Sequence, residues 1–277
     1  MNLNKPTLNN RLIAILIDLL VFAATFYVLA YFILQPILHA TPTFKQHDET
    51  IQTVMVDSGL FSVQNDNIVA TQFKTSKEYE IFFRDFFERY NSPISIDEAF
   101  VEFPDYFTCK DGVCTPIDDE TKMVAFYEDI FFQVASNLLF SVEEYRVANE
   151  YVEMITNIQI FGSMGISAVT FFFVIPLIFK DGKTLGMRVM KIAIVNSGTG
   201  YRAKKTQIIL RQLILLGVEA GLSIFMLGVP AIISLGMLVF SKNNVTLHDY
   251  FAVTMMVNNK EYDVFSSQEE CENAMMN

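Results

Sequence analysis

The sequence is poor in the residues on which most enzymes and metal sites depend. It holds three histidines and three cysteines in 277 residues. His39, His47 and His248 are scattered, and neither HExxH, Gly-x-Ser-x-Gly nor a phosphate-binding loop occurs. No second Cys or His pair stands at zinc-ligand spacing. We therefore expect no enzyme activity, no metal centre and no cofactor.

Two local patterns come closest to a catalytic motif. The glycine-rich loop 182–186 precedes a segment that we predict to be a strand, so it lacks the helix that would bind phosphate. His248 and Asp249 are adjacent, but neighbours in a strand point to opposite faces. Neither pattern supports catalysis.

Charged residues are also scarce, and their distribution is uneven. They make up 18% of the chain, against 52% hydrophobic residues and a mean hydropathy of +0.32, which is typical of a membrane protein. Residues 35–157 carry 22 acidic and 8 basic side chains, whereas 180–211 carries 8 basic and 1 acidic. Because Lys and Arg in short loops mark the cytoplasmic side, this places 180–211 and the N-terminus inside and 35–157 outside.

The first predicted span, 12–34, contains one ionisable residue, Asp18. Its 23 residues would reach roughly 34 Å as a helix, enough to cross a bilayer core of about 30 Å. A carboxylate at that depth is costly unless it is protonated, paired or hydrated. Arg11 lies seven residues earlier on the same helical face, about 10 Å away along the axis. Both side chains could reach toward a shared polar pocket.

Cleavage of residues 1–34 as a secretory signal is the alternative for this segment. The apolar run is longer than the usual h-region of about 7–15 residues, and Asp18 fits badly in such a core. We expect an uncleaved anchor.

Two further apolar stretches follow, at 158–179 and 208–240. The second is too long for one span without heavy tilt, and Leu227-Gly228-Val229-Pro230 offers a break, so we predict two short spans. The latter of these is barely long enough and could be re-entrant. Arg188–Val195 and Phe251–Asn258 have strand patterns, and their pairing would require an even number of spans between them. This favours four spans and a cytoplasmic C-terminus.

The outer segment has the size of a small domain. Lys77–Tyr90 and Asp119–Tyr151 show aromatic and aliphatic side chains at helical spacing, a pattern more typical of a domain core than of a membrane or partner surface. In the second helix we expect Phe126, Ile130, Phe131, Val134, Leu138 and Leu139 on the core side.

Cys109 and Cys114 stand five apart in this segment, with Gly112 available for a turn. A disulfide-closed loop is the expectation outside the membrane, and two free thiols are the alternative. Cys271 would stay reduced in a cytoplasmic tail.

The fold prediction is mostly α, a polytopic membrane helical bundle of about four spans with an α-helical extracytoplasmic domain and a small cytoplasmic β pairing. The predicted order is a first span (1–34), an acidic outer domain (35–157), a second span (158–179), a basic cytoplasmic loop (180–207), third and fourth spans (208–241) and a C-terminal strand and tail (242–277). The predicted location is the cell membrane, multi-pass, with the N-terminus in the cytoplasm.

Several of these residues together resemble the RDD family, named for one arginine and two aspartates. They are Arg11 and Asp18 in the first span, Leu247-His248-Asp249 after the last, the loop beginning Gly182-Lys183-Thr184, and Arg211. The resemblance covers 9–34 and 158–258, with Val253 where members usually have Gly and 35–157 as an unrecognised insertion. It implies a small bacterial membrane protein, with transport suggested and sodium/proton exchange reported for some members.

The first function hypothesis is cation/proton exchange. Asp18 and Glu219 are the two carboxylates within spans, and Arg11 and Arg211 lie near the cytoplasmic ends, where they would bias the titration of both. Arg211 and Glu219 are only loosely co-facial on one helix. The alternative is structural: Arg11 would bind a headgroup phosphate or a neighbouring carboxylate, and Asp18 would pin two helices together. Asp249 would hold Arg188 or Arg211, or cap the next turn.

The second hypothesis is a membrane-anchored binding or assembly protein, whose 123-residue outer domain recruits a protein partner or a cation. The expected partners are therefore the bilayer, Na⁺, H⁺ or another cation, an outer protein, and a second copy of the chain that would help to enclose a pathway. Nucleic acid is not among them.

Overall fold

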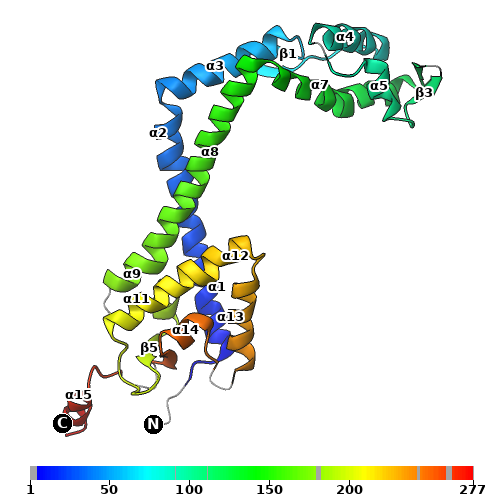
Figure 1. Cartoon of the computed structure of the whole chain (residues 1–277). Coiled ribbons are helices and arrows are strands. Elements are labelled where there is room, and N and C mark those ends of the chain that lie inside the picture. The colour runs from blue at the N-terminus through cyan, green and yellow to red at the C-terminus, as the bar shows by residue number, and fades with distance from the viewer. Residues whose placement is uncertain are drawn as a thin grey trace. The chain divides into compact units, whose positions relative to one another are not determined.

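The computed structural model describes residues 5–90, 92–110, 112–178, 182–241, 244–259 and 264–276. The protein is mostly helical, with three antiparallel strand pairs. Its contacts divide the chain into two compact units, unit 1 (residues 1–35 and 159–277) and unit 2 (36–158). Helix α8 (Glu143–Val169) contributes to both (Figure 1). The predicted helical class is confirmed.

Among the described residues, three helical runs are long and apolar enough to cross a membrane, Leu8–His39, Glu143–Ile178 and Lys205–Phe225. Each is built from consecutive segments. The first comprises α1 (Leu8–Tyr27), the π-helical η1 (Val28–Leu34) and α2 (Gln35–His39); the second, α8, η4 (Thr170–Val174) and α9 (Ile175–Ile178); the third, α11 (Lys205–Leu213), η5 (Ile214–Gly221) and α12 (Leu222–Phe225).

The predicted fourth span corresponds to a shorter helix, α13 (Val229–Phe240). Its 12 residues reach only about 18 Å, less than a bilayer core of about 30 Å. The predicted break before it is present, because Leu227 and Gly228 both adopt positive φ (49° and 83°) and Pro230 opens the new helix. The chain thus reverses between α12 and α13 (Figure 1).

The second helical run contains Pro176, which has no N–H to offer the carbonyl of Phe172 one turn earlier. The side-chain amide of Gln212, on α11, replaces that donor at 2.7 Å when its nitrogen faces Phe172. Helix α11 is therefore tied to the proline turn of a neighbouring run. The carbonyl that Pro176 leaves without its helical donor thus links this run to α11.

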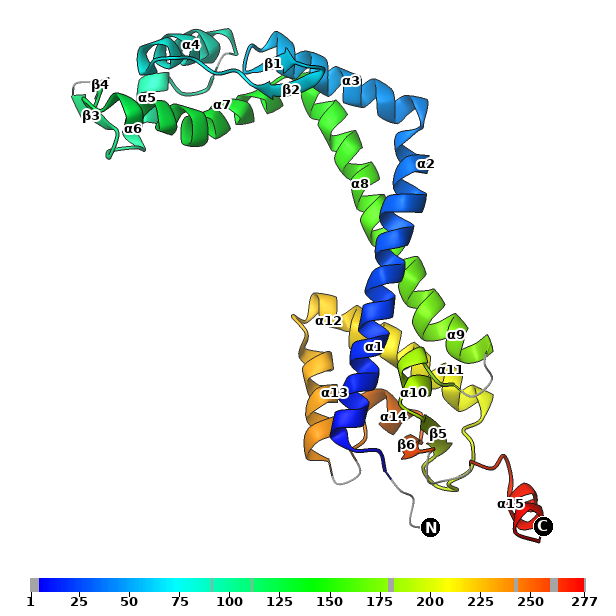
Figure 2. The same cartoon turned by 180° about the vertical axis from the view of Figure 1, so that it is seen from behind.

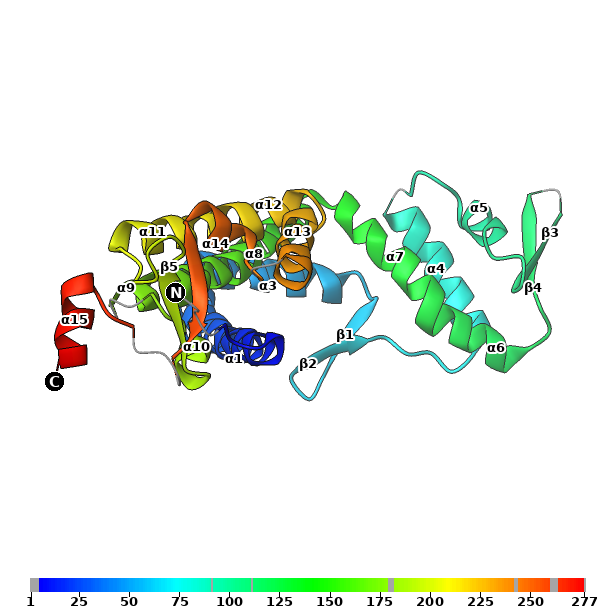
Figure 3. The ribbon, with the colours of Figure 1, turned by 90° about the horizontal axis from the view of Figure 1, so that it is seen from below.

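The predicted strand pairing is confirmed, with shorter strands. β5 (Ile192–Asn196) and β6 (Thr254–Asn258) pair antiparallel, with Ile194 opposite Met256 (Figure 3). The residues before each strand are helical: α10 (Leu185–Val189) and α14 (Leu247–Phe251). The extended conformation predicted from Arg188 and from Phe251 is wrong at those ends, because Thr184 and Thr246 each begin a helical turn instead. A last helix, α15 (Gln268–Met276), ends the described chain.

Unit 2 has an aromatic core. Its helices are α3 (Pro42–Asp57), α4 (Ser76–Arg89), α5 (Ile96–Val101), α6 (Glu120–Ala125), η2 (Phe126–Phe131), α7 (Phe132–Leu138) and the 3₁₀ turn η3 (Leu139–Ser141). Two hairpins that the periodicity did not predict join them, β1 (Phe61–Gln64) with β2 (Asn67–Ala70), and β3 (Phe107–Lys110) with β4 (Val113–Pro116). The buried aromatic residues are Tyr79, Phe83, Phe86, Phe87, Phe100, Phe107, Phe126, Tyr127 and Phe131.

The core role predicted for the aromatic stripes holds, with one exception. Ile130 is 37% exposed, although Phe131 beside it is fully buried. The helix predicted over Asp119–Tyr151 is also interrupted, since Val142 is extended (ψ 115°) between η3 and α8. The spacing of apolar residues continues across Val142, so it did not predict this break.

Candidate functional site

The buried arginine, histidine and carboxylate side chains of the described chain all lie in unit 1. They are Arg11, Asp18, Arg211, Glu219, His248 and Asp249, each at most 7% exposed. Five of the six line one cavity of about 390 Å³, and Asp249 contacts it through Arg211. Charges far apart in the sequence thus gather at one place inside a unit whose outer surface is apolar.

Asp18 connects α1 to the start of α10, which lies beside it (Figure 2). One carboxylate oxygen accepts a hydrogen bond from the Gly186 N–H (2.7 Å) and the other from the Thr184 hydroxyl (2.5 Å). A Cβ at Gly186 would lie 2.0 Å from the carbonyl oxygen of Ala14, so only glycine allows this approach. Both oxygens of Asp18 accept hydrogen bonds, and these two bonds link α1 to the start of α10.

Arg11 joins the start of α1 to the C-terminal part of unit 1. Its guanidinium donates to the carbonyl oxygens of Asn244 and Met256. Its Nε is buried and has no hydrogen-bond partner within the described chain. Arg11 therefore binds protein carbonyls, and the headgroup contact considered from the sequence is not what this geometry offers.

Arg211 and Asp249 form a buried ion pair between α11 and α14. The Arg211 Nε donates to Asp249 at 2.7 Å, and the hydroxyls of Thr254 and Thr246 each donate to Asp249 at 2.8 Å. Burial by itself would raise the pKa of Asp249, but the Arg211 charge and these hydrogen bonds lower the pKa further than burial raises it. Asp249 is therefore an ionised support for α11, α14 and β6.

His248 connects Glu219 to Arg211. Its Nδ1 and its backbone N–H both lie 2.8 Å from Glu219 Oε1, and its Nε2 lies 3.0 Å from an Arg211 nitrogen. Nε2 also lies 2.9 Å from the Thr246 hydroxyl. Because a guanidinium can only donate, the Arg211 contact is a hydrogen bond only when Nε2 accepts, and Nδ1 then carries the proton that faces Glu219. In this tautomer the imidazole is neutral.

Glu219 is the one carboxylate in the cluster with an oxygen left over. The hydrogen bonds to it all reach Oε1, and within the described chain no donor is found at Oε2. The side chain is 91% buried and lines the cavity. Its free oxygen is consequently available to a proton or a ligand in that cavity.

The cluster carries an uncompensated charge. Two arginines face three carboxylates and a neutral histidine, so its formal charge is −1. In an interior of low dielectric an unbalanced charge is costly unless a cation or proton joins it. Of the three carboxylates, Glu219 is the one with an oxygen that receives no hydrogen bond within the described chain.

The five charges chosen from the sequence, Arg11, Asp18, Arg211, Glu219 and Asp249, thus converge. Arg211 and Glu219 meet through His248, and of the two arginines considered for Asp249 the structure pairs Arg211 with it. His248 itself was missed as a site residue, because a strand was expected there and α14 is a helix. The expectation that loop 182–186 leads into a strand is also wrong, because helix α10 begins there. At its start, Thr184 and Gly186 donate hydrogen bonds to Asp18.

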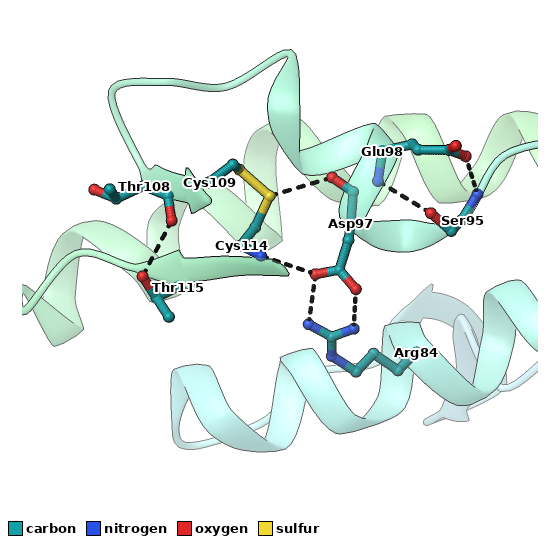
Figure 4. Close-up of a disulfide and its surroundings, with 8 residues drawn as sticks. All are labelled: Arg84, Ser95, Asp97, Glu98, Thr108, Cys109, Cys114 and Thr115. Atoms are coloured by element: carbon teal, nitrogen blue, oxygen red, sulfur yellow. Dashed lines mark hydrogen bonds and ion pairs between the residues drawn. A yellow bond between two sulfur atoms is a disulfide. The ribbon is translucent and has the colours of Figure 1, made fainter. Parts of the chain in front are cut away.

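Unit 2 contains a separate polar cluster beside the two cysteines (Figure 4). Cys109 and Cys114 are opposite one another in the β3–β4 hairpin, with their sulfur atoms 1.93 Å apart. Asp97 accepts from the Cys114 N–H (3.3 Å) and from Arg84 through two nitrogens (2.9 and 3.1 Å). This cluster fixes α4, α5 and the hairpin to each other and leaves no carboxylate oxygen free.

Comparison with known proteins gives a match to one family and nothing else. Neither a curated protein nor a solved structure matches the chain. The family model matches residues 123–253. This range contains Arg211, Glu219, His248 and Asp249, reaches into the segment that the sequence analysis treated as an insertion, and leaves out α1 with Arg11 and Asp18. The matching model is that of the RDD family, so residues 123–253 are similar to an RDD family domain, in a chain whose described residues include three helical runs long and apolar enough to cross a membrane.

Proposed function

We propose that the protein is a membrane carrier that exchanges a monovalent cation for a proton at the Glu219–His248 pair. The observation that carries this proposal is the single surplus negative charge of the buried cluster, located at a carboxylate with a free oxygen in a cavity. A proton and a cation would each neutralise that charge, and both cannot do so at once. Competition for one charge is the basis of exchange.

The geometry assigns different roles to the two carboxylates within the helical runs. Asp18 receives two hydrogen bonds and holds α10 in place, so it supports the cavity without binding the exchanged ion. Glu219 retains one oxygen for the ion, and His248 orients the carboxylate through Oε1. Arg211, bound to Asp249, keeps Nε2 of the imidazole occupied and so keeps the Nδ1 proton toward Glu219.

The topology belongs to the same proposal. In this proposal the protein is a multi-pass cell-membrane protein with its N-terminus and residues 180–211 in the cytoplasm and unit 2 on the outer side, which the basic residues of 180–211 support. The paired strands β5 and β6 put both ends of the α11–α13 segment on one side, which suits two crossings or one re-entrant hairpin. Cysteine labelling at Ser266 and at Ser62 from either side of sealed vesicles tests this arrangement.

The exchange is tested in proteoliposomes containing a pH-sensitive dye. Na⁺, K⁺, Li⁺ or tetramethylammonium is added outside, and proton movement is followed for the wild type and for Glu219→Gln. We expect cation-dependent proton release from the wild type and background signal from Glu219→Gln, because the variant cannot ionise. Wild-type vesicles that release no protons with any of these cations would overturn the proposal.

Asp18→Asn and Glu153→Gln serve as comparison variants. Asp18→Asn weakens the pin to α10, so it should lower the amount of folded protein while the exchange per folded molecule persists. Glu153 is an exposed acid on α8 in unit 2, and its replacement should change neither quantity. Exchange abolished in well-folded Asp18→Asn would move the ion site from Glu219 to Asp18.

A second function, a membrane-anchored binding protein, is favoured by one observation on unit 2. This unit has a core of its own, with nine fully or nearly buried aromatic residues. A domain of this kind can recruit an outer partner independently of transport. Crosslinking of the full-length protein in intact cells would capture that partner, and variants of Glu219 should leave its capture unchanged.

A further inference from the structure

The cavity at Glu219 is larger than an inorganic ion requires. Its volume of about 390 Å³ would hold roughly 13 water molecules at about 30 Å³ each. It falls instead in the range of about 300–1,000 Å³ that is typical of pockets for small organic molecules. A single dehydrated alkali cation would occupy only a small part of it.

The walls of the cavity are mostly apolar. Phe172 and Leu215 lie on two of the helical runs, and Leu238 lies on α13. Water is stable in a cavity only where several polar partners surround it, and an apolar cavity otherwise stays dry or binds an apolar molecule. An occupant with a hydrocarbon body therefore suits these walls better than a cluster of waters around Na⁺.

The polar and apolar parts of the cavity are separated. The buried floor carries Arg211, Glu219 and His248, none more than 7% exposed. At the rim, Ile15 and Leu19 of α1 and Leu235 of α13 are 44%, 52% and 52% exposed. If α1 crosses the membrane as the candidate span to which it belongs, its rim residues Ile15 and Leu19 would face the hydrocarbon region. A molecule dissolved in the bilayer could enter between α1 and α13.

We infer that the cavity binds a monovalent organic cation with an apolar body, which enters from the bilayer and places its charge against the free oxygen of Glu219. This inference takes from the proposed function only the assignment of Glu219 as the exchanging carboxylate. The apolar walls select the body of the ligand, and the cluster charge of −1 selects its sign. A neutral lipid tail would fill the walls and leave the charge unbalanced.

The test uses two probes of the same shape and opposite charge, tetraphenylphosphonium and tetraphenylborate. Binding of each to the full-length protein in nanodiscs is measured by equilibrium dialysis, with empty nanodiscs as the blank. We expect saturable binding of one tetraphenylphosphonium per chain and no specific binding of tetraphenylborate. Glu219→Gln should weaken binding of the cation by about 30-fold or more, the loss expected when one partner of a buried charge pair is removed.

A pair of rim variants keeps the test independent of the charge cluster. Leu235→Trp narrows the entrance and should abolish tetraphenylphosphonium binding, while Ile232→Trp, on the same helix but outside the cavity lining, should leave it unchanged. Ile232→Trp should also retain exchange of small cations for protons, since it lies outside the cavity lining. Equal binding of the two probes, or full binding in Glu219→Gln, would overturn the inference and indicate a lipid-filled cavity.

The two proposals fail in different ways. Exchange of Na⁺ or K⁺ without tetraphenylphosphonium binding would retain the carrier and reject the organic cation. Glu219-dependent tetraphenylphosphonium binding without any proton exchange would retain the binding site and reject the carrier.

Discussion

The two units of this protein arrange charge and apolar surface in opposite ways. Unit 2 buries nine aromatic residues and keeps its carboxylates and bases at the surface, as in Arg84 with Asp97. Unit 1 exposes leucines such as Leu16 (57%) and Leu20 (63%). It also contains the buried charged side chains of the described residues, and two of them, Arg211 and Asp249, are only 1% exposed. The same residue types thus have reversed positions in one chain.

This contrast shows which solvent each unit is built for. In water, burying aromatic area stabilises a fold and exposed ion pairs add little. In hydrocarbon, exposed leucine costs nothing and every polar group must find a partner inside the protein. Unit 1 satisfies its buried charges almost completely, and the oxygen of Glu219 that remains free therefore points to function more strongly than any surface acid of unit 2.

The largest effect should come from breaking one buried pair in unit 1. Arg211→Gln leaves Asp249 buried without its cation and removes the donor to His248 Nε2. Loss of one partner of a buried pair typically costs about 3–5 kcal/mol of unfolding free energy. We expect little folded protein, measured by circular dichroism melting in detergent micelles.

The matched variant in unit 2 is Arg84→Gln, which removes the corresponding partner of Asp97. Arg84 is 36% exposed, so water compensates for much of the loss and about 1 kcal/mol is expected. The double variant Arg211→Gln/Asp249→Asn, which removes both buried charges, should be less destabilised than the sum of its single variants. Equal effects of Arg211→Gln and Arg84→Gln would contradict the contrast between the units.

An intermediate effect is expected for the cysteines of unit 2. Outside the cytoplasm Cys109 and Cys114 should form a disulfide, and closing so short a loop contributes about 2 kcal/mol, at the low end of the usual range. Cys109→Ser should lower the unfolding free energy of unit 2 by that amount, seen as a lower melting temperature, while exchange stays unchanged. Full reaction of both cysteines with maleimide in intact cells would show free thiols instead and place the hairpin in a reducing compartment.

The sequence predicted more of this structure than of its site. Length, charge asymmetry and periodicity were enough for the helical runs, the break at Gly228 and the pairing of the 192–196 and 254–258 strands. The buried charges were found for a simple physical reason. An ionisable residue such as Asp18 or Glu219 in an apolar run must have a partner, so its position alone marks it.

The sequence patterns did not predict the short helices that begin at a capping threonine. α10 and α14 are five residues each, too short for helical periodicity, and each follows a threonine at its N-cap. Because α14 is a helix, His248 contacts Glu219 and Arg211. In a strand, His248 would point to the face opposite that of Asp249. Threonine before Leu-Gly and before Leu-His was the available signal, through the N-cap preference.

The smallest effect is expected for Asp97, whose contribution to the stability of unit 2 should depend on pH. Hydrogen bonds and charge from Arg84 hold the pKa of the Asp97 carboxyl below its usual value, although partial burial opposes this. A carboxyl with a lowered folded-state pKa stabilises the fold above its unfolded pKa of about 3.9, and that contribution is lost as the pH falls through the folded value. Near neutral pH we expect Asp97→Asn to destabilise unit 2 by about 1 kcal/mol.

The difference between wild type and Asp97→Asn should therefore be constant from pH 7 to about pH 5 and shrink below about pH 4, where the wild-type carboxyl begins to take up its proton. Hydrogen–deuterium exchange of the α5 and β3–β4 amides in the full-length protein measures it, with Glu102→Gln, an exposed neighbour at the end of α5, as the control. A difference that stays the same at pH 3 would mean that the hydrogen bonds of the Asp97 carboxyl group, not its titrating charge, account for the stability. The charge of Asp97 would then not be needed for the stability of unit 2, whereas we expect the buried charges of unit 1 to be needed for its stability.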